Sequence, residues 1–219
     1  MEKFFISKLH NSSKRNYLER MINDKVSCMK IAKKYGYDYW DGDRKYGYGG
    51  YKYIPGRMEK VAKQIIKTYS LTKNSKILDL GCGKGYLLYE LKKIIPSLEV
   101  CGLDISNYAI KNSKEEIKKY LNVRDVRKRL PYKNNSFDLV FSFGLLHNFS
   151  LSHLIKAIKE INRVGKKHFI MVESYRNNQE LFNLQCWALT CEMFLSRQEW
   201  ISFFKSQNYK GDFEFIYFK

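Results

Sequence analysis

The sequence predicts an α/β fold with a mostly parallel central sheet and helices on both faces. From about residue 56 onward, short apolar runs typical of buried parallel strands alternate with segments whose apolar residues recur at helical spacing. A glycine-rich turn at residues 81–85 joins one such strand to the next helix, and Asp104 ends the following strand. We therefore expect a core at residues 57–219, preceded by an N-terminal helical and loop cap at residues 1–56.

The individual elements follow from these patterns in chain order. Residues 57–69 place their apolar side chains on one helical face, and Pro96 ends the next helix. Strands are expected at 77–80, 100–104, 121–126, 138–143, 168–173 and 213–218. Helices are expected at 57–69, 86–95, 108–120, 151–164, 179–189 and 197–207.

The N-terminal segment has a different character. Residues 14–35 are expected to form one or two basic helices, and residues 41–53 are dense in glycine and tyrosine without a periodic apolar face. Two interpretations of this tyrosine-rich segment stay open: its rings fold back onto the core as a surface loop, or they form a lid over a binding site. In the second case Tyr46, Tyr48 and Tyr51 are candidate substrate-binding residues.

Composition limits the partners and the compartment. No run of the sequence approaches the roughly 20 apolar residues that span a bilayer, and the start lacks a signal-peptide pattern. The five cysteines form no pair with metal-ligand spacing, so we expect no metal, free thiols and a cytoplasmic location. The net charge of +18 is compatible with a nucleic-acid partner, but its spread along the chain favours generic basicity or a small anionic substrate.

The glycine-rich turn carries the functional prediction. Residues 77–85 read Ile-Leu-Asp-Leu-Gly-Cys-Gly-Lys-Gly, a strand that runs into a turn where the backbone can approach a ligand. Asp104, about 20 residues on, is placed to accept hydrogen bonds from two ribose hydroxyls. Position 86 is tyrosine instead of the third glycine of a dinucleotide motif, so the pattern favours a different nucleoside cofactor.

This turn closely resembles motif I of class I methyltransferases, which have a Rossmann-like fold and use S-adenosyl-L-methionine. Further similarities follow in order: residues 100–106 to the second motif, residues 123–126 and 130–140 to the stretch that closes over adenine, and residues 141–147 to the lining of the methyl-transfer cavity. The resemblance implies that Asp125 takes the adenine amino group and that the backbone at Val126 binds the ring. It implies cofactor contacts from Asp79, Gly81, Cys82, Gly83, Asp104, Ile105, Asp125, Val126 and Phe143.

One departure from the family concerns the end of the chain. The family usually has two strands after its last helix, and here only residues 213–218 follow it as a strand. Residues 190–194, before that helix, are a candidate for the other strand.

Three further residues are candidates for the chemistry. His147, just past the fourth strand, is the candidate general base, because its ordinary pKa lies near neutral pH; the alternative is a histidine that caps the next helix or bonds a backbone carbonyl. Tyr175 and Arg176 follow the fifth strand and are candidates for substrate binding. The alternative for Arg176 is an ion pair with Glu173 or Glu180.

The acceptor of the methyl group is a separate question. Residues 46–53 and 200–204 are similar to bacterial methyltransferases of surface-polysaccharide gene clusters, which implies O-methylation of a sugar or of a phosphorylated or nucleotide-linked precursor. The alternatives are an RNA methyltransferase, which the charge permits, and a non-catalytic binding partner, which would have no need of the glycine turn and its acids.

Overall fold

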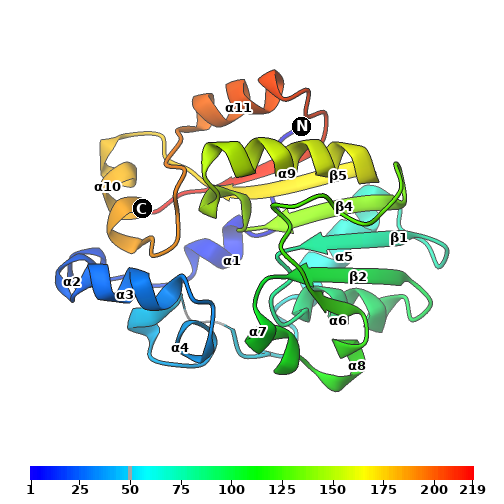
Figure 1. Cartoon of the computed structure of the whole chain (residues 1–219), viewed down its shortest axis with the longest axis horizontal. Coiled ribbons are helices and arrows are strands. Elements are labelled where there is room, and N and C mark those ends of the chain that lie inside the picture. The colour runs from blue at the N-terminus through cyan, green and yellow to red at the C-terminus, as the bar shows by residue number, and fades with distance from the viewer. Residues whose placement is uncertain (49–50) are drawn as a thin grey trace.

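The computed structural model describes residues 1–48 and 51–219, and its centre is a six-stranded sheet (Figure 1). The strand order is β3-β2-β1-β4-β5-β6, and every neighbouring pair is parallel. The parallel α/β fold is therefore confirmed. The strands are β1 (Lys76–Leu80), β2 (Glu99–Asp104), β3 (Leu121–Val123), β4 (Phe137–Phe143), β5 (Gly165–Glu173) and β6 (Asp212–Ile216).

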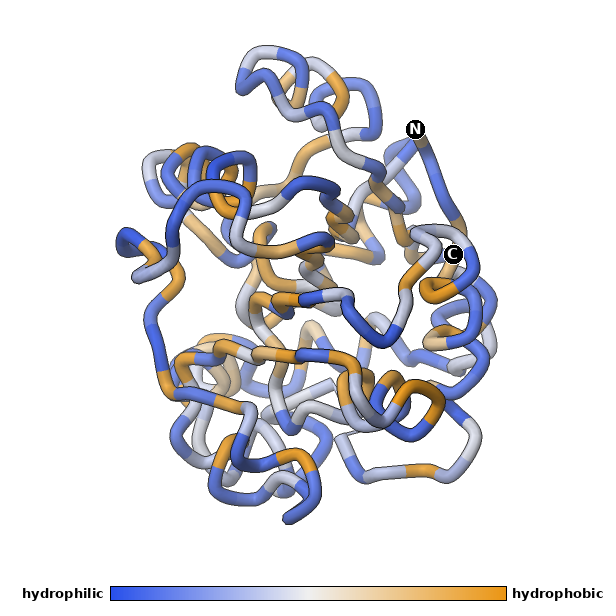
Figure 2. The backbone as a smooth tube through the Cα atoms, turned by 90° about the vertical axis from the view of Figure 1, so that its right-hand side faces the viewer, coloured by the Kyte–Doolittle hydropathy of each residue, from blue (hydrophilic) through white to orange (hydrophobic). Residues whose placement is uncertain are grey.

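Helices cover both faces of the sheet. Successive strand residues point to opposite sides, so apolar residues on each side pack against helices. Ile77 packs on one side with α5 (Glu59–Tyr69), α6 (Tyr86–Ile94), α7 (Asn107–Lys111) and α8 (Glu115–Lys118). Leu78 packs on the other side with α9 (Leu151–Val164) and α11 (Arg197–Ser206), which lie together above the sheet in Figure 1. Figure 2 shows apolar stretches at the centre and mostly polar outer loops.

The N-terminal helices gather beyond the carboxyl ends of the strands (Figure 1). These elements are α1 (Ser7–Asn11), α2 (Tyr17–Ile22), α3 (Lys25–Ala32), α4 (Tyr37–Trp40) and the 3₁₀ turn η1 (Arg44–Tyr46), with α10 (Asn178–Trp187) beside α2. The buried Glu214 carboxylate on β6 holds the start of α1, accepting the backbone N–H groups of Phe5 and Ser7 at 2.9 and 2.7 Å.

Several predicted elements are a residue or two shorter in the structure, and two are shorter by more. The helix expected at 108–120 is two short helices, α7 and α8, because the Ser113 hydroxyl bonds the Ile110 carbonyl and Lys114 is extended. The strand expected at 121–126 ends at Val123, and the backbone N–H of Arg124 donates to Asp104 at 2.8 Å. This early end turns Asp125 away from the sheet.

The candidate strand at residues 190–194 is not formed. The backbone N–H groups of Glu192 and Met193 instead donate to the carbonyl of His147, both at 2.9 Å. Beyond β6, residue Glu2 makes a single parallel bridge to Phe213. No helix in the described ranges is long and apolar enough to cross a membrane.

Candidate functional site

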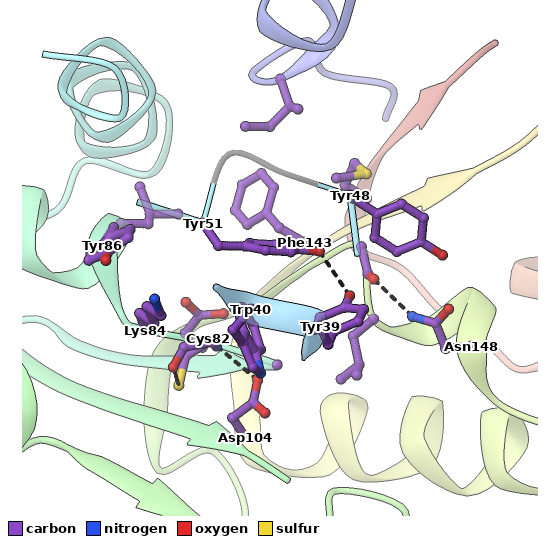
Figure 3. Close-up of a pocket in the computed structure, with 18 of the residues that line it drawn as sticks. Tyr39, Trp40, Tyr48, Tyr51, Cys82, Lys84, Tyr86, Asp104, Phe143 and Asn148 are labelled. Carbon is purple, nitrogen blue, oxygen red and sulfur yellow. Dashed lines mark hydrogen bonds between the residues drawn. The ribbon is translucent and has the colours of Figure 1, made fainter. Parts of the chain in front are cut away.

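A cavity of about 470 Å³ lies where the carboxyl ends of the central strands meet the N-terminal helices (Figure 3). This volume falls in the range of small-molecule sites, roughly 300–1,000 Å³. The lining contains every residue predicted to contact the cofactor, together with His147, Tyr48 and Tyr51. The lining therefore brings together residues that lie more than 90 positions apart in the sequence.

The glycine turn forms one wall of the cavity. Gly81, Gly83 and Gly85 have φ angles of +79°, +54° and +69°, a region that other residues rarely adopt. A Cβ atom on Gly83 would lie 2.7 Å from the Trp40 ring, so the turn also needs glycine for space. The sharp turn predicted from the sequence is confirmed.

Asp104 lies beside this turn with its carboxylate oriented by the backbone. Its two oxygens accept the N–H groups of Gly83 and Ser106, each at 2.8 Å, and its side chain is buried. Each oxygen keeps a further lone pair, so the carboxylate can also accept hydroxyl groups of a ligand. Burial and the nearby Asp104 charge raise the pKa of Asp79 well above its ordinary value.

The next part of the lining suits a planar base. Ile105 and Val126 supply apolar side chains, and the Asp125 carboxylate lies beside them. The Arg127 Nε donates to Asp125 at 2.8 Å and lowers the pKa of its carboxyl group. Together with Asp104, this arrangement fits a nucleoside: oriented acceptors for sugar hydroxyls and an apolar slot with an acid at its edge.

Aromatic residues of the N-terminal segment cover the cavity. The Tyr39 and Tyr51 rings stack with centroids 5.3 Å apart, and the Trp40 and Tyr51 centroids are 4.6 Å apart. Figure 3 shows Trp40 next to Cys82 and Asp104. Gly49 and Gly50 of the tyrosine-rich segment lie outside the described residues.

Polar contacts fasten this aromatic cover to the core. Trp40 Nε1 donates to the Ser106 hydroxyl at 2.8 Å. The buried Lys84 ammonium pairs with Asp41 at 2.6 Å, and the Tyr108 hydroxyl donates to the same carboxylate at 2.8 Å.

The tyrosines of the segment differ in position: some line the cavity, as expected for a lid, and one packs away from it, as expected for a surface loop. Tyr48 and Tyr51 line the cavity, although the Tyr48 hydroxyl also accepts the backbone N–H of Leu189 at 2.8 Å. Tyr46 lies outside the cavity lining and packs half-buried against Cys28 and its neighbours.

His147 lies in the 3₁₀ turn η2 (Leu146–Asn148), buried at the cavity wall. Its Nδ1 accepts the backbone N–H of Glu173 at 3.2 Å, which places the proton of the neutral ring on Nε2, 3.4 Å from Glu173 Oε2. Burial lowers the pKa of His147 to about 3. Engaged at Nδ1 and weakly basic, His147 is poorly suited to the general-base role expected for it.

Tyr175 and Arg176 lie outside the cavity lining, contrary to their expected substrate role. Beyond β5 the chain turns toward α10 and α11, so Arg176 Nε donates to Glu180 at 3.0 Å and the guanidinium covers the Tyr217 ring. Tyr175 makes a backbone bridge to Ser196. The ion-pair interpretation of Arg176, with Glu180 as partner, is confirmed.

The cavity lining also contains Glu173, Arg15 and Arg44, of which Arg15 is the residue that sequence reasoning missed. Glu173 ends β5, and Arg15 and Arg44 come from the N-terminal segment. The Arg15 guanidinium lies over the Trp187 and Phe218 rings, and its Nε has no hydrogen-bond partner among the described residues. Glu173 could be found from the sequence, because it ends a predicted strand. Nothing in the local sequence identifies Arg15 as a site residue.

Comparisons with known proteins identify the family of this chain. The family model described as a methyltransferase domain matches residues 71–211, well over half of the chain. Among curated relatives, the mitochondrial arginine-hydroxylase NDUFAF5 of Mus musculus is 31% identical over 58% of this chain and 37% of its own length. The demethylmenaquinone methyltransferase of Staphylococcus carnosus is 37% identical over 48% of this chain and 44% of its own. The chain thus spans less than half the length of these curated relatives.

Solved structures share the fold. The YcgJ protein of Bacillus subtilis superposes with a TM-score of 0.54 at 20% identity, covering 67% of this chain and 66% of its own. At that identity the likeness concerns the fold alone. The family match covers β1 to α11, including the glycine turn and Asp104. The chain belongs to the methyltransferase-domain family.

Proposed function

We propose that this chain transfers a methyl group from S-adenosylmethionine to a small anionic acceptor, such as a sugar, phosphorylated or nucleotide-linked precursor of a bacterial surface polysaccharide. The observation that carries the proposal is a single cavity whose lining has two chemically different parts. One part of the lining has the glycine turn and Asp104, which suit a nucleoside. Another part has Glu173 and, over the Trp187 ring, the guanidinium groups of Arg15 and Arg44.

The cofactor part would hold S-adenosylmethionine through the residues predicted for it. Asp104 would accept the ribose hydroxyls, Ile105 and Val126 would flank the base, and the backbone at Gly81 and Gly83 would approach the remainder. When bound, this molecule supplies a methyl group already activated by a sulfonium charge. The protein then has to orient the acceptor and exclude water, which the aromatic cover supports.

The acceptor part favours an anion. Arg15 and Arg44 belong to it, and the Arg15 guanidinium makes its hydrogen bonds to the His10 ring and to the carbonyls of His10 and Ser13. Among the described residues Arg15 forms no direct ion pair with a carboxylate, although Glu173 acts on it electrostatically. A guanidinium without a direct ion-pair partner is suited to a phosphate or carboxylate of a substrate.

A panel of acceptors tests this proposal. Purified protein is incubated with S-adenosylmethionine and either sugar phosphates, nucleotide-linked sugars, the matching neutral sugars, or transfer and ribosomal RNA, and S-adenosylhomocysteine formation is measured. We expect turnover with an anionic small molecule, lost in Arg15→Gln and retained in the surface control Arg129→Gln. Equal turnover of neutral and anionic sugars would contradict the acceptor assignment.

RNA methylation is the second candidate, because the net charge of +18 would attract a polyanion. Turnover confined to RNA in the same panel, weakened steeply by salt, would favour it.

A further inference from the structure

Glu173 is held rigidly at the cavity by contacts to its backbone. Its carbonyl accepts Trp200 Nε1 of α11 at 3.0 Å, and its N–H donates to His147. The N–H of the next residue, Ser174, donates to Ile216 of β6 at 3.0 Å. Three elements therefore fix the position from which this side chain enters the cavity.

The Glu173 carboxylate is buried and sparsely bonded. The side chain lines the cavity with 8% of the residue exposed, and its Oε2 has no hydrogen-bond partner among the described residues. His147 Nε2 lies 3.4 Å from this oxygen. A buried carboxylate without its normal complement of donors is costly to fold, so such a group at a ligand cavity points to a use with the ligand.

We propose that Glu173 accepts the proton of the methyl acceptor, with His147 as the residue that positions it. This inference rests on the proposed function, because it concerns the acceptor part of the same cavity. The acceptor's nucleophilic atom loses its proton to a Glu173 oxygen and forms the new bond to the methyl carbon, while the carbon–sulfur bond breaks and its electron pair stays on sulfur. The proton later leaves to solvent.

The electrostatic surroundings suit this role. Burial raises the pKa of Glu173 to about 7, while the positive charges of Arg15 and Lys25 act in the opposite direction. A carboxyl group with a pKa near neutral pH is half ionised there and is a stronger base than an ordinary glutamate. The neutral His147 ring adds no charge to the pair.

Other titratable groups that interact electrostatically with Glu173 keep one charge state near neutral pH, with one exception. Tyr48 and Tyr51 of the tyrosine-rich segment and Cys191 after α10 all have their pKa raised, mainly by burial, and stay neutral. Lys25 on α3 is the exception, because burial lowers its pKa to about 8. A test must therefore separate Glu173 from Lys25.

Measuring the protons released on ligand binding distinguishes Glu173 from Lys25. Calorimetric titrations in two buffers of different ionisation enthalpy, near pH 7, count the protons released per site. The sulfonium of S-adenosylmethionine favours an ionised Glu173, so we expect release of about 0.3–0.5 proton. S-adenosylhomocysteine has the same amino acid part with an uncharged sulfur, and we expect far less release.

Variants assign the proton to its residue. Glu173→Gln should bind S-adenosylmethionine with release near zero, and Glu173→Asp should restore part of it. The control Lys25→Gln should keep proton release but move its pH midpoint upward, because the Lys25 charge lowers the pKa of Glu173. Release unchanged in Glu173→Gln, or equal for the two ligands, would overturn the role of Glu173 while leaving the cofactor assignment intact. Absence of S-adenosylmethionine binding to any variant would overturn the proposed function and this inference with it.

Discussion

At the scale of single residues, the cavity lining contains three buried acids with a raised pKa. Asp79, Asp104 and Glu173 all have their pKa raised, with burial as the largest cause, so the folded protein disfavours their charged forms. Such groups cost stability, and all three line the same cavity. The concentration of this cost at one place is typical of a functional site.

Glu173 gives a pH-dependent stability with a defined sign. Its pKa rises from 4.5 in the unfolded chain to about 7 in the folded protein, so the folded state binds more protons between these values. Stability is therefore lost as pH rises from 4.5 to 7, by about 3 kcal/mol in total. Urea unfolding of wild type and Glu173→Gln across this range measures the effect, because the shared contribution of His147 cancels in the difference. A difference in unfolding free energy that stays constant with pH would contradict the raised pKa.

At the scale of elements, the site depends on how the N-terminal helices are attached to the sheet. Glu214 on β6 connects the edge of the sheet to the start of α1, and Asp41, after α4, pairs with Lys84 beside the glycine turn. Both attachments join segments far apart in the sequence. Local periodicity therefore could not predict them, and α1 and α4 were not among the expected elements.

The Glu214 attachment predicts a loss of stability. Glu214→Ala leaves backbone N–H groups at the start of α1 without their charged acceptor, which should lower the free energy of unfolding by about 3 kcal/mol. Urea unfolding measures the change, and Glu115→Ala, at an exposed acid of α8, should change it little. A Glu214→Ala protein as stable as wild type would show that α1 is not held through this carboxylate.

The Asp41–Lys84 pair predicts the rate at which the cover opens. If opening requires breaking this buried pair, Asp41→Asn should speed dissociation of S-adenosylhomocysteine by about tenfold or more. Stopped-flow fluorescence provides the rate, since Trp40 lies at the site. The matched control is Glu59→Gln, which breaks the exposed pair with Lys63 on α5. Equal dissociation rates for the two variants would mean that the cover opens by another movement.

At the scale of the whole molecule, the sequence predicted what local patterns encode. The strands around the glycine turn, the helix Leu151–Val164 and the acid Asp104 follow from apolar periodicity and motif spacing, and the structure places them as expected. The acceptor part could not be predicted in the same way. Arg15 lines the cavity just after α1, which is attached to the last strand of the chain, and Arg176 lies outside the cavity lining, bonded to Glu180 one helical turn away.

The account depends most on Asp104 as an acceptor of the cofactor's ribose, and calorimetric titration of S-adenosylhomocysteine into wild type and Asp104→Ala tests it most directly. Loss of a charge-assisted acceptor costs about 1.5–3 kcal/mol, so affinity should fall roughly 10- to 150-fold while the far-ultraviolet circular dichroism of the variant matches wild type. Equal affinity of the two proteins would contradict a nucleoside cofactor bound between the glycine turn and the end of β2.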